Sequence, residues 1–272
     1  MKKTWMKRMI AISAAAAMAL PMAACGSKSG DSKSGEKQKF IVGFDAAFPP
    51  YGYQDENGEY VGFDLDLAAE VCNRNDWELV KQPIDWDTKD MELNSGTISC
   101  IWNGFTMNGR EDEYAWTDPY VDNSQVFVVK SDSGIASFAD LAGKSVAVQT
   151  DSSAEAALKE DDNKDLLDSF KELVVVADYN TAFMNLDSDA VNAIAMDIGV
   201  AKYQLESRGE GYKILDEHLN SEKYAIGFKK GNTELCDKVN EGLQQVLADG
   251  TFDKLAEKYG IADMVCLEKK GE

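Results

Sequence analysis

Short apolar runs recur along the chain, separated by longer stretches in which apolar residues return every three or four positions. The short runs predict buried strands, and the periodic stretches predict helices packed on them. The expected strands are residues 40–44, 78–80, 98–102, 126–129, 145–149, 173–176, 193–196, 214–215 and 224–228. Helices are expected from Asp64 and from Ile198 onward, and over 86–94, 150–158, 180–186, 233–248 and 251–259. Because strands and helices alternate, the pattern predicts an α/β fold.

The first strand leads into a stretch that carries candidate pocket residues. Asp45 directly follows residues 40–44, and Phe48 and Tyr51 come soon after it. In open α/β sheets ligands collect outside the carboxyl ends of the strands, so position alone makes these three side chains candidates. An ordinary strand, turn and helix without a ligand is the alternative that spacing leaves open.

Two local signals complete this opening unit. Residues 55–58 read Asp-Glu-Asn-Gly and predict a tight turn, because Asn and Gly tolerate positive φ. Asp64 stands just before the apolar positions of the first helix, so we expect it at the helix N-cap.

Composition narrows the function classes. A formal net charge of −20 argues against binding to nucleic acid or to an anionic bilayer through the folded body. With one histidine in the chain, a histidine-rich metal site is excluded, and we expect no metal and no cofactor. A length of 272 residues allows one large domain or two smaller ones, and 44% hydrophobic residues are ample for a core.

The N-terminal segment follows a different pattern. Residues 1–24 combine Lys and Arg with an apolar run that is too short to span a membrane, which predicts a signal peptide. Ala-Ala-Cys at its end resembles the lipobox of bacterial lipoproteins, which implies lipidation of Cys25, although Met22 stands where leucine is usual. A secretory signal with an incidental cysteine is the alternative. Residues 25–39 are Gly, Ser and Lys rich and predict a flexible tether.

The opening motifs F-x-P-Y, D-E-N-G and G-F-D-L-D-L-A closely resemble the amino-acid-binding proteins of ABC importers, and the resemblance covers most of residues 40–260. It implies a two-lobed periplasmic-binding-protein-like fold of type II, in which each lobe is a mixed sheet flanked by helices. Two hinge crossings, near 126–130 and 222–228, join the lobes and suit closure around a ligand. Lobe one is expected to be residues 40–127 plus 225–272, and lobe two 130–222.

The resemblance also implies which residues of the first lobe hold the ligand's α-carboxylate. The segment WNGFTMNGR resembles the family's G-x-T/S-x-T-x-E-R segment, with an interval one residue shorter. The implied contacts are Asn103, Gly104, Thr106 and Arg110. A guanidinium group matches a carboxylate with two parallel donors. The alternative is an Arg110 paired with Glu111, Asp112 or Glu113 on a solvated face.

In the second lobe the resemblance implies that Ser152 and Ser153 complete this grip at a helix start, where free N–H groups favour a carboxylate. Ser152 could equally be an ordinary N-cap. Asp197 falls where the family keeps the acid that pairs with the ligand's α-ammonium group. The alternative is that Asp197 caps the helix from Ile198.

The ligand's own side chain is expected to meet Asp45, Phe48, Trp86 and Gln149. Asp45 disfavours an acidic ligand, the aromatic rings suit an aliphatic stem or a cation, and Gln149 suits a polar tip. We therefore expect a free L-amino acid that is polar and either neutral or cationic. Glutamine, cystine, lysine, arginine and histidine remain open.

Taken with the leader, the resemblance implies a monomeric binding lipoprotein and not an enzyme. It would be held at the cell membrane on the extracytoplasmic side by its lipid alone and would deliver its ligand to ABC transporter permease subunits. The alternative is an exported enzyme on the same fold, such as a cyclohexadienyl dehydratase, although no general acid or base can be assembled from the sequence. A sensor domain of a larger signalling protein is the third class.

Cysteines other than Cys25 permit several arrangements in an exported chain. Cys72 and Cys100 fit buried apolar positions. A bridge between Cys236 and Cys266 is one further possibility.

Overall fold

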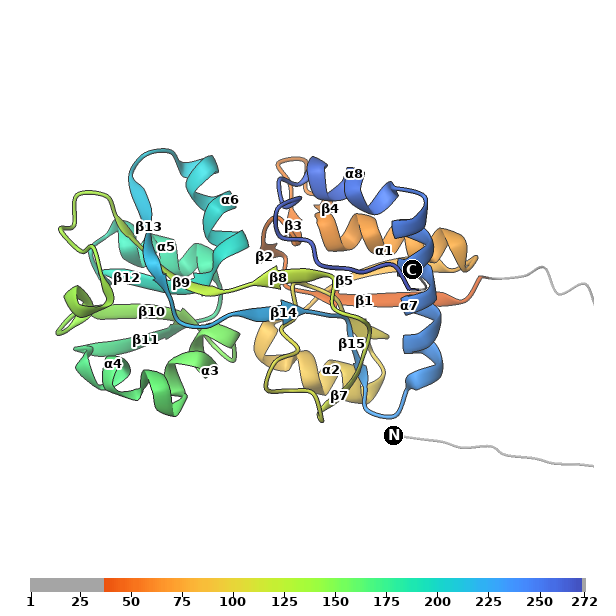
Figure 1. The fold of residues 1–272 in the computed structure, drawn as a ribbon, viewed down its shortest axis with the longest axis horizontal. Helices are drawn as coiled ribbons and strands as arrows, with labels where there is room; N and C mark the ends of the chain where they lie inside the picture. Colours follow the sequence, from red (N-terminus) through yellow and green to blue (C-terminus); the bar gives the residue numbers. More distant parts are fainter. Residues whose placement is uncertain (1–36, 271–272) are drawn as a thin grey trace, which may run out of the picture. The chain divides into compact units, whose positions relative to one another are not determined.

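A computed structural model describes residues 37–270, which form two lobes, each built on a five-stranded sheet (Figure 1). The first sheet is mixed, because β1 runs parallel to β5 and β6 while β15 runs antiparallel to β6 and β7. Across this sheet the strands are ordered β5 (Glu78–Pro83), β1 (Lys39–Phe44), β6 (Cys100–Ile101), β15 (Gly227–Lys229) and β7 (Tyr114–Trp116).

The second sheet is also mixed. β10 runs parallel to β11 and β12, and β9 runs antiparallel to β12 and β13. The order is β11 (Glu172–Val176), β10 (Ser145–Gln149), β12 (Ala193–Asp197), β9 (Gln125–Lys130) and β13 (Tyr212–His218). The two mixed sheets flanked by helices confirm the predicted fold class.

A pair of short antiparallel strands runs between the two sheets (Figure 1). β8 (Val121–Asn123) leads into the second sheet, and β14 (Glu222–Tyr224) returns from it. Residues 126–129, which the sequence places near the first crossing, pair within the second sheet as part of β9. The assignment of lobe boundaries stays a prediction, and the strand pairing favours β8 and β14 as the hinge.

Helices cover both sheets, and a small three-stranded sheet stands beside the first. The first lobe carries α1 (Phe63–Arg74), η1 (Trp86–Thr88), α2 (Lys89–Ser95), α7 (Thr233–Ala248) and α8 (Thr251–Lys258). The second carries η2 (Phe138–Leu141), α3 (Ser153–Lys159), η3 (Asp161–Asn163), α4 (Lys164–Ser169), α5 (Tyr179–Asp187) and α6 (Ile198–Arg208). The small sheet consists of β2 (Ala47–Phe48), β3 (Gly52–Gln54) and β4 (Tyr60–Val61). The turn predicted at 55–58 joins β3 to β4, with Gly58 at φ 83°.

The start of α1 corrects one expectation. Gly62 is the N-cap residue, and no side chain caps the helix. Asp64 is instead fully buried and accepts hydrogen bonds from the Gly104 N–H at 2.6 Å and the Tyr120 hydroxyl at 2.8 Å. The prediction of Asp64 as N-cap was wrong, because this carboxylate faces donors from distant segments and not the free N–H groups of its own helix.

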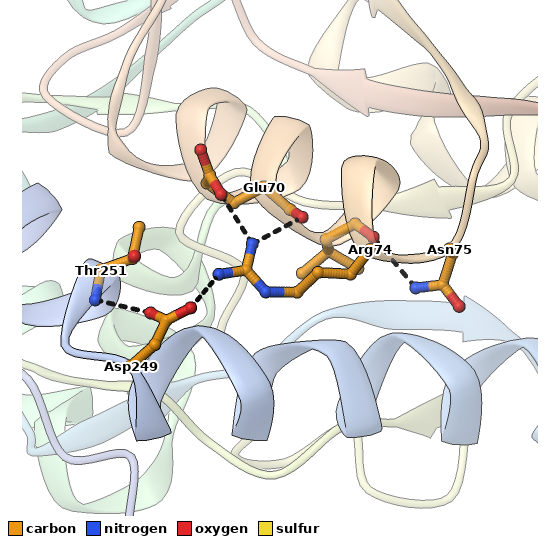
Figure 2. Close-up of polar contacts among 6 residues, drawn as sticks. Glu70, Arg74, Asn75, Asp249 and Thr251 are labelled. Atoms are coloured by element: carbon orange, nitrogen blue, oxygen red, sulfur yellow. Dashed lines mark hydrogen bonds and ion pairs between the residues drawn. The ribbon is translucent and has the colours of Figure 1, made fainter.

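An ion-pair network fastens the end of α1 to the corner between α7 and α8 (Figure 2). The Arg74 guanidinium donates to Glu70 at 2.6 Å and to Asp249 at 2.5 Å. Hydrogen bonds from Thr251, followed by Arg74, lower the pKa of Asp249 to about 2. These contacts hold α7 and α8 against α1, the helix that follows the loop of Asp45, Phe48 and Tyr51.

The cysteines of the described part are all free. Cys72, Cys100 and Cys236 are buried, and Cys266 is half-buried. The possible Cys236–Cys266 bridge is therefore not formed, and the buried positions expected for Cys72 and Cys100 are confirmed.

The predicted signal peptide, Cys25 and most of the tether lie outside the described residues. Within residues 37–270, no helix has the length and apolar character needed to cross a membrane.

Candidate ligand-binding site

A cleft of about 940 Å³ opens between the lobes and is lined by both. The first lobe contributes residues 45–47, 83–88 and 92, and the second contributes Thr150, Ala177, Asp178, Asn180 and Thr181. Among the described lining residues, every ionisable side chain is acidic: Asp45, Asp85, Asp87, Glu92 and Asp178. A cleft of this character attracts a cationic group.

Asp45 and Gln149 meet across this cleft. The Gln149 amide donates to the Asp45 carboxylate at 2.7 Å, and the Ala47 N–H donates to the same carboxylate at 2.8 Å. Asp45 directly follows β1 in the first lobe, while Gln149 ends β10 in the second. Burial raises the pKa of Asp45 above its usual value. The fold thus brings Asp45 and Gln149, which the sequence analysis selected independently, into contact.

Aromatic rings fill the space deeper than Asp45. The Phe48 ring lies 5.9 Å from Tyr51 and 6.0 Å from Tyr179 of the second lobe, between ring centroids. Tyr51 meets Tyr224 edge to face at 5.2 Å. A Cβ on Gly199 would lie 2.4 Å from the Tyr51 hydroxyl, so only glycine allows the start of α6 to approach this ring.

Trp86 lines the cleft from η1 and is half-buried. Its ring meets Phe105 edge to face at 5.6 Å, and the Lys89 ammonium lies 5.2 Å from the ring centroid. One side of Trp86 therefore packs on the first lobe, while it also contributes to the cleft wall.

The loop after β6 is held tightly. Gly104 has φ 54°, and a Cβ there would lie 2.9 Å from both the Phe48 and the Tyr224 rings. The buried Thr106 hydroxyl donates to Glu222 at 2.8 Å. Both polar atoms of the Asn103 side chain are buried and have no hydrogen-bond partner among the described residues.

Arg110 is half-buried beside this loop. Its guanidinium carbon lies 5.2 Å from the Phe105 ring centroid, and one nitrogen donates to the Thr106 carbonyl at 3.3 Å. Within residues 37–270 it makes no ion pair within 4.0 Å, so the alternative pairing with Glu111, Asp112 or Glu113 is not present. The contact with Thr106 connects Arg110 to the loop, but the structure shows no contact between Arg110 and Asp197.

At the start of α3, Ser152 is buried and its hydroxyl accepts from the Glu155 N–H at 3.1 Å. Ser152 therefore is the N-cap residue, as one of its two interpretations proposed. Ser153 is the first residue of the helix and is half-buried.

Asp197 stands at the N-cap position of α6, but its side chain makes no cap hydrogen bond. Its carboxylate instead accepts from the Tyr224 hydroxyl at 2.6 Å, Gln125 at 2.7 Å and Asn123 at 2.8 Å. Burial, followed by the nearby Glu222 charge, raises the pKa of Asp197 to about 7. A cation beside this carboxylate would reverse that effect.

The residues that surround Asp197 were missed in the sequence. Asn123, Gln125, Glu222 and Tyr224 come from the hinge strands and β9, and Tyr179 comes from α5. No spacing links them, since they converge only when the two chain crossings lie side by side.

Two lobes, joined by paired strands and separated by a cleft lined from both sides, are the architecture of a solute-binding protein. The chain matches the model of the bacterial extracellular solute-binding proteins, family 3, over residues 40–262. It belongs to this family.

Curated and solved relatives agree with this assignment. The chain is 30% identical over 266 residues to the arginine-binding extracellular protein ArtP of Bacillus subtilis, covering 93% of this chain and 98% of that one. A substrate-binding protein of an ABC uptake transporter from Streptococcus pneumoniae, solved with bound histidine, has a TM-score of 0.80 at 33% identity, covering 84% and 95% of the two chains.

One solved relative bears on the enzyme alternative. It is an ancestral amino-acid-binding protein described as a precursor of cyclohexadienyl dehydratase, with a TM-score of 0.73 at 30% identity, covering 81% of this chain and 95% of that one. That relative is itself described as a binding protein.

Proposed function

We propose that this protein captures a free amino acid with a cationic side chain in the cleft between its lobes and delivers it to the permease of an ABC transporter. The observation that carries the proposal is the acidic cleft, in which Asp45 and Asp178 face a cavity without a basic lining residue among those described. A cationic tip would gain from these charges, whereas an acidic tip would be repelled.

The ligand's backbone groups have separate partners in this proposal. Arg110 binds the α-carboxylate, with the Thr106 loop and the helix start at Ser152 and Ser153 providing further donors. Asp197 binds the α-ammonium group. Since Arg110 comes from the first lobe and Asp197 from the second, closing the cleft and binding the zwitterion are one event.

The proposed cellular location depends on residues 1–25, which lie outside the described part. Cleavage after residue 24 and lipidation of Cys25 would hold the protein at the extracytoplasmic side of the cell membrane, with the tether leaving the lobes free to reach a permease. No catalytic step is proposed, because a ligand that is released unchanged to a permease needs none.

Thermal unfolding with individual amino acids tests the ligand class. At about 100 times the dissociation constant a ligand adds about 2.7 kcal/mol to the free energy of unfolding, which raises Tm by roughly 5 to 10 °C. L-Arginine and L-lysine are expected to raise Tm by this amount. L-Glutamine should raise Tm less, and L-glutamate should not raise it.

The variant Asp45→Asn keeps the shape of the cleft and removes one charge, so it should weaken binding of L-arginine more than binding of L-glutamine. Glu206→Gln, an exposed acid on α6, is the matched control. A larger stabilisation by L-glutamate than by L-arginine would contradict the proposed ligand class. Conversion of arogenate or prephenate by the purified protein would instead support the enzyme alternative.

A further inference from the structure

Two buried carboxylates meet at the hinge and share their hydrogen-bond donors. The Asn123 amide nitrogen donates to Asp197 at 2.8 Å and to Glu222 at 2.6 Å. The Gln125 amide nitrogen donates to the same two carboxylates at 2.7 Å each. Asp197 and Glu222 are each 4% exposed, so two negative charges would lie close together and away from water.

Hydrogen-bond acceptors are in excess around this pair. The amide oxygens of Asn123 and Gln125 are buried and have no partner among the described residues. Turning either amide over would place its oxygen against two carboxylates, so rotation offers no remedy. The two amide nitrogens are therefore fixed on the carboxylates, and the positive charge that the pair lacks would come from an added proton or a ligand ammonium group.

The groups that face the pair from the surrounding elements carry no positive charge. Asp197 meets the hydroxyls of Tyr179 on α5 at 3.4 Å and Tyr224 on β14 at 2.6 Å. Glu222 meets the Thr106 hydroxyl at 2.8 Å and the Asn220 amide at 3.2 Å. Within residues 37–270 neither carboxylate has a Lys, Arg or His nitrogen within 4.0 Å.

Basic side chains do lie nearby, in a neighbouring pocket of about 430 Å³ that Glu222 also lines. Lys202 there pairs with Asp263 at 3.1 Å, and Lys223 pairs with Asp122 at 2.8 Å. His218 lines the same pocket. The two lysines are thus already matched by acids of their own.

Two adjacent carboxylates in a site of this kind do not both ionise near neutral pH. We propose that Asp197 and Glu222 hold one proton between them in the ligand-free protein, and that the α-ammonium group of an amino acid displaces this proton when it binds. The carboxyl O–H bond breaks, the proton passes to solvent, and the ammonium group keeps all its hydrogens. The site therefore exchanges one positive charge for another.

Glu222 acts in this scheme as a positioning residue, through Asp197. It stands on the hinge strand β14, receives a hydrogen bond from Thr106 of the first lobe and shares two amides with Asp197 of the second. Loss of the proton thus occurs where the lobes pivot. The inference rests on the proposed function, because it requires that a ligand ammonium group reaches Asp197.

Calorimetry with L-arginine in two buffers of different ionisation enthalpy counts the protons released. The wild-type protein is expected to release close to one proton per ligand at about pH 6 and little at about pH 8, with affinity falling up to about tenfold per pH unit below about pH 7. In Glu222→Gln the like charge is gone, so Asp197 ionises at lower pH and much less proton should be released at about pH 6. Glu210→Gln, an exposed acid, should match the wild type.

A second experiment measures the thermal unfolding of the ligand-free protein as a function of pH. A carboxyl group whose pKa is raised on folding costs stability as the pH rises from its unfolded value to its folded value. The Tm of the ligand-free wild type should therefore fall between about pH 5 and about pH 7, and should fall less in Glu222→Gln and in Asp197→Asn. Burial also raises the pKa of Asp64 to about 7, but this contribution is common to all variants and cancels in the comparison.

The wild-type measurement alone can overturn the proposal, even if a variant does not fold. No proton release at about pH 6, or equal release by wild type and Glu222→Gln, would show that the pair is not protonated as proposed. If L-arginine binds to no variant, the proposed ligand fails, and the ligand-free unfolding curves still decide whether the pair carries a proton.

Discussion

The ammonium group of Lys89 in α2 forms an ion pair with the carboxylate of Asp151, just before α3 of the opposite lobe. The Lys89 side chain is 2% exposed, whereas Asp151 is 54% exposed and has φ 55°. With the Asp45–Gln149 contact, this pair ties the lobes together across the cleft. The lobes are thus joined by two polar contacts, as well as by the contact between the Phe48 and Tyr179 rings.

Replacing Lys89 by methionine should favour the open arrangement. The change keeps the packing beside Trp86 but removes the charge that faces Asp151. Since Asp151 is half exposed and can be rehydrated, the loss is expected near 1 kcal/mol, or about fivefold in ligand affinity. Small-angle scattering should show a larger radius of gyration for the ligand-free variant. Lys164→Met, which removes a solvent-exposed pair with Asp168 within α4, is the control. Identical scattering from the wild type, Lys89→Met and Lys164→Met would show that the Lys89 contact does not hold the lobes together.

Arg110→Ala and Asp197→Ala should each weaken amino acid binding by about two to three orders of magnitude or more. Removing one partner of a buried charge pair costs about 3 to 5 kcal/mol, because the other charge is left without a partner. Isothermal titration with analogues separates the two roles. A decarboxylated amine should lose little further affinity on Arg110→Ala, and a des-amino acid should lose little on Asp197→Ala.

Controls for these variants come from the same residue types. Arg208→Ala removes a guanidinium that stacks on Phe183 in the second lobe, and Asp165→Ala removes an exposed acid on α4. Binding of the parent amino acid within threefold of wild type by both test variants would place Arg110 and Asp197 outside the site.

Ligand binding should change the fluorescence of Trp86. Its half-buried ring lines the cleft, so a bound side chain would alter its exposure to water. Calorimetric titration of Trp86→Phe with L-arginine should still show binding. Most of the fluorescence change, however, should be lost in this variant. Trp77→Phe, whose ring stacks on Phe40 at 5.1 Å, should keep the full signal. A signal that persists in Trp86→Phe would assign it to another tryptophan.

Cys25→Ser should release the protein from the membrane without changing its affinity for the ligand. The lipobox-like sequence and the tether are the basis of this expectation. Fractionation of cells that express each form, followed by immunoblotting, measures the distribution. Cys72→Ser, a change in the folded body, should leave the protein in the membrane fraction, and equal retention of Cys25→Ser would exclude the lipid anchor.

The periodicity of apolar residues was sufficient to predict helices and strands whose pattern is local. The helix predicted over 233–248 is α7 (Thr233–Ala248), and the strand predicted over 145–149 is β10 (Ser145–Gln149). The return strand predicted over 224–228 is instead two strands, β14 and β15, because its halves pair with different sheets. Propensity along the chain cannot distinguish one continuous strand from two that change partners.

For the site, the sequence determined which residue types stand at strand ends and helix starts, and the family resemblance assigned them roles. Asp45, Gln149 and Asp197 could be selected in this way, since Asp45 directly follows a strand and the other two each end one. Glu222 could not, because its importance depends on Asn123, which lies 99 positions earlier, and on Asp197 across the same amide. The energy of a buried charge depends on what desolvates it and on which charges lie beside it, and only the paired hinge strands bring those groups together.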